Sequence, residues 1–272
     1  MASIHTNAAA MNALATLRDV NMSLTETQNR VSTGFKVQTA KDNAAYFSIS
    51  ETMKSDSGMY KAIDEGLTLT KNSLATGRLG AETVADLAQD FVERVAFAQE
   101  NNIDRAKVQQ ELDELVNQMD TTISQATFNG VSMVEGGADV TVVTGITRVG
   151  GFATTSMTVS PVDLGAISTA LAAVNVGTST DLAADLTTAE TQLAAALDAA
   201  TSLGIGEKAV ETQQEFLKAL TERLDNGIGA MVDADMEEEA ARLQALQVQQ
   251  QLATQSLSIA NQAPQNILSL FR

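Results

Sequence analysis

The chain has 272 residues, 44% of them hydrophobic and 19% charged, and 34 acidic against 17 basic residues give it a formal net charge of −17. Nucleic-acid phosphates and anionic membrane surfaces would repel so acidic a chain, so we expect neither nucleic-acid binding nor membrane insertion. Without cysteine, and with one histidine (His5) and two prolines, the sequence excludes disulfides and thiolate catalysis and favours long helices.

Targeting signals are also absent from the sequence. No apolar run approaches the length of a membrane span, and the first residues lack the basic and apolar regions of a cleaved secretory signal. Taken alone, these features indicate a cytoplasmic protein.

The two ends of the chain carry matching heptad patterns. Residues 3–35 and 232–260 repeat apolar and polar side chains at alternating spacings of three and four. We expect a helix at each end, the second stopped by Pro264, and we expect the two helices to pair. The predicted seam consists of Leu14, Leu17, Asn21, Leu24, Gln28 and Val31 with Met236, Leu243, Leu246, Gln250 and Leu257.

A second long helix is predicted to begin at Ser48, which forms a capping-box pattern with Glu51. Its seam extends to Phe91 and Val95. Helix propensity alone would allow a break at its glycines, which are Gly58, Gly66, Gly77 and Gly80. A third helix should turn back antiparallel after Asn101-Asn102, with the seam Val108, Leu112, Leu115, Met119 and Ile123.

The pattern changes in the middle of the chain. Phe128, Asn129 and Gly130 predict a turn, and residues 141–159 read as short strands in hairpins. Helix should return over residues 182–228, with an interruption at residues 203–206. The expected fold is therefore mostly α, with long antiparallel helices, a terminal coiled coil and a small β-hairpin insert.

No catalytic site, cofactor site or metal site is expected. Residues 237–239 are consecutive glutamates, but they point in different directions on a helix and have no histidine nearby, so they predict a solvated, partly seam-facing helix start. The polar seams of the terminal helices suggest ends that order only when copies pack together. Self-association and a soluble helical binding or signalling module remain equal alternatives at this point.

Four segments resemble a known family, the bacterial flagellins. They are residues 28–37 (QNRVSTGFKV), 40–45 (AKDNAA), 126–130 (ATFNG) and 260–272 (ANQAPQNILSLFR). SLG at 202–204 and DAD at 233–235 add to the match. The motif residues are Arg30, Ser32, Gly34, Lys41, Asp42, Phe128, Asn129, Gly130, Pro264, Gln265, Asn266 and Arg272.

This resemblance implies an architecture of three parts. Residues 1–40 and 228–272 would form an inner terminal coiled-coil domain, and residues 41–135 and 185–227 a helical rod domain. Residues 136–184 would form a small β-rich, Ser/Thr-rich surface insert. The resemblance also implies that the long glycine-containing helix is continuous.

The resemblance further implies a structural, non-enzymatic subunit that polymerises into the flagellar filament and serves motility. Its expected partners are other copies, paralogous flagellins, an export chaperone, the filament cap and hook-junction proteins. It would be secreted by the flagellar type III apparatus without a cleaved signal, which replaces the cytoplasmic inference. A soluble coiled-coil module and a hook–filament junction protein are the alternatives.

Two surface features are also expected. The insert offers hydroxyls for O-linked sugars at Thr141, Thr144, Thr147, Thr154, Thr155, Ser156, Thr158 and Ser160. Many flagellins are sensed by an animal innate receptor through an Arg, a Leu and a Glu. Aligned on the turn at 126–130, these positions fall on Phe91, Val95 and Glu111, a degenerate patch that predicts weak sensing; Arg94 would replace the Arg if the alignment slips.

Overall fold

The computed structural model describes residues 7–270, with side chains described up to residue 262. The chain divides into two compact units, unit 1 (Met1–Asp56 with Arg223–Arg272) and unit 2 (Ser57–Glu222). Within the described range, no helix is long and apolar enough to cross a membrane. His5 and Arg272 lie outside the described residues.

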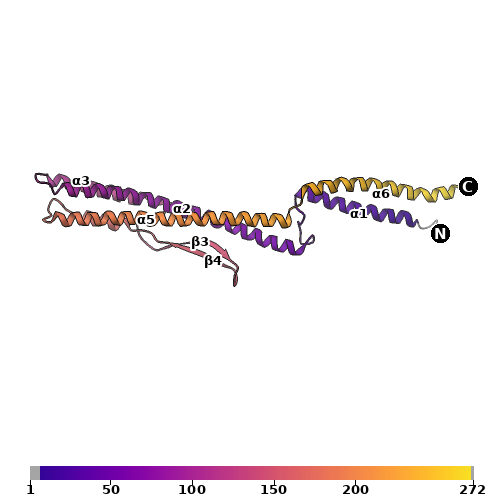
Figure 1. Cartoon of the computed structure of the whole chain (residues 1–272), viewed down its shortest axis with the longest axis horizontal. Helices are drawn as coiled ribbons and strands as arrows, with labels where there is room; N and C mark the ends of the chain where they lie inside the picture. The colour runs from indigo at the N-terminus through magenta and orange to yellow at the C-terminus, as the bar shows by residue number, and fades with distance from the viewer. Residues whose placement is uncertain (1–6, 271–272) are drawn as a thin grey trace. The chain divides into compact units, whose positions relative to one another are not determined.

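The fold class agrees with the sequence prediction. The helices of the described chain are α1 (Ala8–Thr33), α2 (Ala44–Phe97), α3 (Arg105–Gln125), α4 (Leu164–Ala172), α5 (Leu182–Val232) and α6 (Met236–Leu270). The strands are β1 (Thr127–Phe128), β2 (Val131–Ser132), β3 (Val140–Thr147) and β4 (Ala153–Val159), and they pair antiparallel as β1–β2 and β3–β4 (Figure 1).

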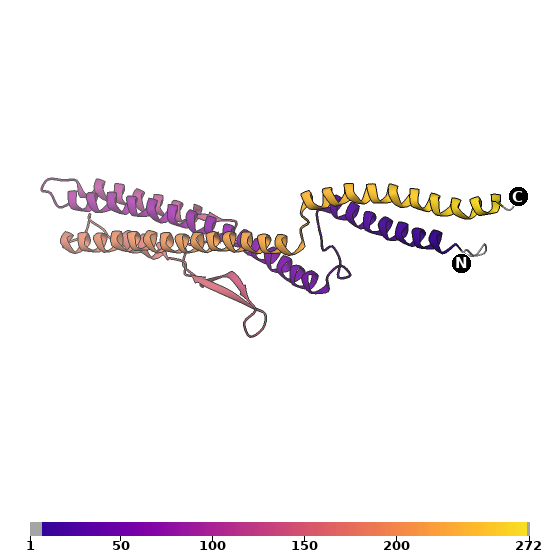
Figure 2. The ribbon, with the colours of Figure 1, turned by 45° about the vertical axis from the view of Figure 1, so that its right-hand side comes forward.

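Unit 1 is built around the antiparallel pair of α1 and α6, which lie side by side in both views (Figures 1 and 2). Asn7 caps α1 by accepting a hydrogen bond from the Ala10 amide at 3.1 Å, and its side-chain nitrogen donates to the Ala260 carbonyl at 2.8 Å. Gly34, with φ of +76°, ends α1 in the left-handed conformation that suits glycine. The two ends of the chain therefore pair, as their heptads predict.

Unit 2 has a continuous core between α2, α3 and α5, with α4 and the strands packed against it. α3 turns back antiparallel after the Asn101-Asn102 loop, as expected, and four of its five predicted seam residues are buried. The largest fully buried side chains include Leu67, Leu74, Phe91, Leu112, Met119, Leu164, Leu171, Leu203 and Leu217. This core fixes α2 and α3, which form a groove between them, and the β3–β4 hairpin.

Several predicted boundaries were wrong. α2 begins at Ala44, because Asn43 rather than Ser48 supplies the cap: its side-chain oxygen accepts from the amides of Ala45 and Tyr46, both at 3.1 Å. α6 continues through Pro264 to Leu270. Proline removes one helical hydrogen bond at a cost of about 3 kcal/mol, which need not end a helix of good helix formers.

Glycine does not break the long helices. α2 and α5 are continuous, as the family resemblance implies for α2, so the predicted interruption at residues 203–206 is wrong. A Cβ on Gly77 would lie 2.9 Å from the Met133 Cβ, and one on Gly80 would lie 2.6 Å from the Ala126 Cβ. These glycines therefore serve close packing, which outweighs their low helix propensity.

The insert agrees with the prediction only in part. β3 and β4 form the expected hairpin, with a register shift between Val143 and Gly145. α4 was not predicted; Asp163 caps its start by accepting a hydrogen bond from the Ala166 amide, and the helix buries Leu164, Ile167 and Leu171. Leu164, Ile167 and Leu171 do have the spacing of one helix face, but the Ser/Thr-rich composition of the insert favoured strands and turns in the prediction.

Candidate functional site

The seam between α1 and α6 follows the predicted register on one helix only. On α6 the predicted seam residues are buried or half-buried, except Met236, which is 45% exposed. On α1 the predicted Leu17, Leu24 and Val31 are half-buried, on the side of the helix that packs against α6. The positions between them are instead taken by Ala13, Val20 and Thr27, while Leu14, Asn21 and Gln28 are exposed.

The seam register of α1 differs from the predicted one because heptad spacing allows two registers. Both registers share every seventh residue, and the intervening residue can lie either three or four positions on. The observed register places the smaller Ala13 and Thr27 against α6. Asn21 still reaches across at the edge of the seam, where its oxygen accepts a hydrogen bond from Gln250 at 2.7 Å.

α6 is apolar on two opposite faces. One face is the seam; the other repeats at the same heptad spacing and is exposed. This second face, the outer stripe, consists of Ala241, Ala245, Val248, Leu252 and Ile259. Val248, Leu252 and Ile259 are 55%, 58% and 68% exposed, so unit 1 leaves them without cover.

A charged pair crosses the seam. Arg30 on α1 donates to the carboxylate of Glu239 on α6 at 3.1 Å and to Glu26 at 2.6 Å. Glu239 is 6% exposed, and its second oxygen, Oε2, has no hydrogen-bond partner. Of the three consecutive glutamates, this one faces the seam and the other two are exposed, in line with a partly seam-facing helix start.

The motif after α1 forms a turn region, residues 34–43, that packs on the end of α5 and the start of α6. The backbone of Phe35 bridges Asp233, the Lys36 amide donates to the Val232 carbonyl at 2.7 Å, and Val37 is buried with Val232 and Ile228. Two segments nearly 200 residues apart in the sequence are thus joined by main-chain hydrogen bonds.

Asp42 organises this turn region. Its Oδ2 accepts hydrogen bonds from the amides of Thr39 at 2.9 Å and Gln38 at 3.0 Å, and from the Thr39 hydroxyl at 3.1 Å. These bonds, led by the one from the Thr39 amide, lower the pKa of the Asp42 carboxyl, and the charge of Arg30 acts in the same direction. Two family-motif residues, Arg30 and Asp42, therefore both stabilise the turn region through charge and hydrogen bonds, and Gly34 between them ends α1. Ser32 and Lys41 are exposed.

The ATFNG motif, residues 126–130, forms the predicted turn between β1 and β2. Asn129 and Gly130 both have positive φ, of 50° and 78°, as a two-residue hairpin turn requires. Phe128 and Asn129 line an apolar cavity of about 200 Å³ with Leu69, Met133 and Val140. Of the C-terminal motif, Pro264, Gln265 and Asn266 lie in α6, and their side chains fall outside the described ones.

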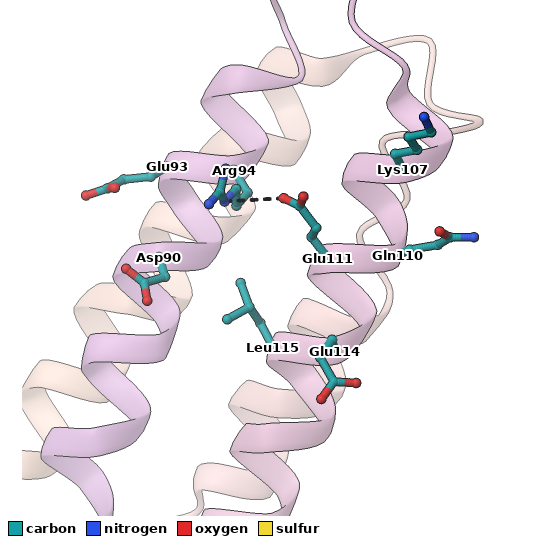
Figure 3. Close-up of a pocket in the computed structure, with 8 residues that line it drawn as sticks. All are labelled: Asp90, Glu93, Arg94, Lys107, Gln110, Glu111, Glu114 and Leu115. Atoms are coloured by element: carbon teal, nitrogen blue, oxygen red, sulfur yellow. Dashed lines mark ion pairs between the residues drawn. The ribbon is translucent and has the colours of Figure 1, made fainter.

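A charged groove lies between α2 and α3 (Figure 3). It has a volume of about 610 Å³ and is lined by Asp90, Glu93, Arg94, Lys107, Gln110, Glu111, Glu114 and Leu115. Arg94 Nε lies 3.4 Å from Glu111 Oε2, which links the two helices across the groove.

The groove corrects the predicted receptor patch. Phe91 and Val95 are 1% and 0% exposed, as their place on the helix seam requires, and so they cannot form a surface patch. Glu111 is exposed, and the basic residue beside it is Arg94. Alignment on a distant turn could not reveal this, because a shift of one to three residues along a helix moves a side chain from the core to the surface.

The β3–β4 hairpin carries most of the predicted hydroxyls at its surface. Thr141, Thr154, Thr155, Ser156, Thr158 and Ser160 are exposed, and Thr144 and Thr147 are half-buried. The Thr144 hydroxyl donates to that of Thr155 at 3.3 Å, and the Thr144 carbonyl accepts from Gln213 at 2.8 Å. Within the described part of the chain, no group of three or more acidic or histidine side chains is placed to hold a metal ion.

Comparison with known proteins identifies two matching regions. Residues 4–139 match the family model described as the bacterial flagellin N-terminal helical region, and residues 186–271 match that of the bacterial flagellin C-terminal helical region. The matched ranges cover α1 to β2, most of α5 and all of α6, which contain the turn region, the seam and the groove.

Similar proteins extend over the whole chain. A flagellin of Brucella melitensis is 37% identical, and flagellin C of Rhizobium meliloti is 33% identical; both alignments cover 100% of this chain and 100% of the relative. Flagellin FljK of Caulobacter vibrioides is 32% identical over 99% of this chain and 98% of its own length.

Proposed function

Because this chain belongs to the bacterial flagellins and is a structural subunit of the flagellar filament, we propose that its terminal helix pair carries contacts between subunits. The observation that supports this assignment is the second apolar face of α6. The seam face packs on α1, whereas the outer stripe, represented by Val248, Leu252 and Ile259, is exposed in the single chain.

Covering that stripe would favour assembly. Full burial of a Leu or Ile side chain contributes about 1.5–3 kcal/mol, and each subunit presents several such side chains. α1 adds Met11 and Met22, which are 65% and 63% exposed outside the seam. A row of apolar side chains on an exposed helix is typical of an interaction surface.

The polar seam supports the same proposal. Asn21, Gln250, Arg30 and Glu239 occupy or border positions that are apolar in a stable two-helix coiled coil. The α1–α6 pair therefore gains limited stability from its own seam. Packing of neighbouring copies on the outer stripe supplies the burial that the single pair lacks.

Two matched substitutions on α6 test the outer stripe. Leu252→Asp lies on the stripe, 58% exposed, and should leave the monomer's helix content unchanged while abolishing elongation from filament seeds, measured by sedimentation. Leu257→Asp lies on the seam and should also speed amide exchange in α1. Normal elongation of the Leu252→Asp protein would contradict the proposal.

The heterologous partners and the route of export also belong to the proposal. As a flagellin, the chain would use an export chaperone, the filament cap and hook-junction proteins, and would leave through the flagellar type III apparatus without a cleaved signal. A chain without cysteine needs no disulfide after export, which suits this route. Intact-mass analysis of extracellular filaments tests it, since loss of an N-terminal segment would count against it.

The third part of the proposal concerns the insert. We propose that residues 136–184 form an outward surface that carries O-linked sugars on the exposed hydroxyls of β4, with residues 1–40 and 228–272 inside and the rod between. Native filaments should then have a mass above that of the unmodified chain. Thr154, Thr155, Ser156 and Thr158 are the first acceptors to examine by peptide mapping.

No observation favours the two alternatives, a soluble coiled-coil module and a hook–filament junction protein. Both flagellin helical regions match, in order and at both ends of the chain. We propose no catalytic activity and no cofactor for a protein of this structural family.

A further inference from the structure

The turn between β3 and β4 carries the one basic residue of a long acidic stretch. From residue 108 to residue 207 the sequence has twelve Asp and Glu residues and a single Lys or Arg, which is Arg148. Its guanidinium carbon lies 5.8 Å from the centre of the Phe152 ring. Val149 and Phe152 are 93% and 59% exposed, so this hairpin tip combines positive charge with apolar surface.

The groove between α2 and α3 has the complementary character. Four carboxylates line it against two basic residues, and Arg94 is already paired with Glu111. Leu115 is half-buried, and Figure 3 shows its side chain in the space between the two helices, in the part of the groove that Asp90 and Glu114 also line. This end of the groove therefore offers negative charge beside apolar surface.

The hairpin tip cannot reach the groove of its own chain. The Ile146 carbonyl accepts a hydrogen bond from the Tyr60 hydroxyl at 3.4 Å, which fixes the hairpin beside the start of unit 2. Asp90 lies 30 residues further along the same continuous helix, about 45 Å away at 1.5 Å per residue. Both views show the tip directed away from the α2–α3 loop (Figures 1 and 2).

We propose that the hairpin tip of one copy docks in the α2–α3 groove of a second copy, with Arg148 facing Asp90 and Glu114 and with Val149 covering Leu115. The inference rests on the proposed polymerisation and names one of its contacts. Because tip and groove are different surfaces far apart on one subunit, the contact is heterologous, and it can repeat into an open-ended row of subunits.

A cysteine pair tests the contact directly, since the chain has no cysteine of its own. In filaments of the Val149→Cys, Glu114→Cys protein, mild oxidation should give a ladder of covalent multimers on a non-reducing gel. The control pair, Val149→Cys with Glu190→Cys, places the second thiol at an exposed position on α5 and should stay monomeric. Filaments of the first pair without a ladder would overturn the contact and leave polymerisation standing.

Charge reversal provides an independent test. Arg148→Glu should raise the monomer concentration needed for seeded elongation about tenfold, and adding Asp90→Arg should restore most of the loss. Lys218→Glu, an equal charge change at an exposed position on α5, should shift it less than about twofold. Equal effects of Arg148→Glu and Lys218→Glu would overturn the contact; failure of the unchanged protein to elongate any seed would refute polymerisation itself.

Discussion

Arg30 on α1 donates a hydrogen bond at 3.1 Å to Glu239 on α6, and the Glu239 carboxylate is buried. The pair joins residues 209 positions apart in the sequence, and it leaves one buried carboxylate oxygen without a partner. Arg30 is the closer of two cations to Glu239, since Arg242 Nη1 lies 3.9 Å from the same oxygen. Loss of Arg30 would therefore leave a buried carboxylate with only this longer ion pair, which would be costly.

The first prediction follows from that dependence. Arg30→Ala should destabilise the α1–α6 pair by about 2 kcal/mol, and the same substitution should cost less in a Glu239→Gln background, where no charge is left buried. Amide hydrogen exchange of α1 in the full-length monomer measures both. Glu26→Ala, which removes only the exposed partner, should cost less than about 0.5 kcal/mol; equal costs in both backgrounds would contradict the coupling.

The second prediction concerns two glycines of α2. Gly80→Ala should destabilise unit 2 by roughly 1–3 kcal/mol, because the new Cβ would lie 2.6 Å from that of Ala126. Gly66→Ala meets nothing within 4 Å and should stabilise by about 0.5–1 kcal/mol through helix propensity. Urea unfolding followed by circular dichroism separates the two, and effects of the same sign would refute the packing role of Gly80.

The third prediction is a pH dependence in the turn region. The pKa of Asp42 is lowered in the folded chain, so its stabilisation is present above the ordinary value of 3.8 and is lost as pH falls through the folded value. At neutral pH, Asp42→Asn should speed exchange of the Gln38 and Thr39 amides, which donate to Asp42. The difference from the unchanged protein should shrink in acid; a difference that grows on acidification would disprove this role.

The fourth prediction concerns the ends of the chain. Deleting either the first 30 or the last 30 residues should leave a folded, largely helical unit 2, which has its own core, and should abolish polymerisation. Circular dichroism and seeded sedimentation test the two halves of this statement. Filaments of normal appearance from either truncated protein would remove the terminal pair from assembly.

The fifth prediction concerns the innate receptor. We expect depolymerised protein to activate it about tenfold or more weakly than an enteric flagellin in a reporter-cell assay. Arg94 does face Glu111 at the groove, but the position four residues after Arg94 holds the small, buried Ala98 instead of a Leu. Phe91→Arg should lower stability rather than raise the signal, since it would bury a charge. Equal potency would show that Arg94 and Glu111 on the exposed groove suffice.

The sequence alone determined the elements that depend on repeated local pattern. The heptads at both ends predicted α1, α6 and their pairing, and on α6 they predicted the seam nearly residue by residue. The Asn129-Gly130 turn and the β3–β4 hairpin followed from turn residues and alternation. The heptads are strong signals because they repeat a short-range constraint over many residues, and the turn is a strong signal because Asn and Gly readily adopt the positive φ that it requires.

Tertiary structure decided the features in which two local choices have similar energy. Ala13 rather than Leu14 faces α6, because only packing selects between spacings of three and four. Gly77 and Gly80 lie inside one helix and serve close packing there, because Met133, just after β2, and Ala126, at the end of α3, leave no room for a larger side chain. Arg94 rather than Phe91 reaches the groove, because Phe91 is packed in the core of unit 2. In each case local propensity favours the alternatives about equally, and packing against residues distant in the sequence selects one of them.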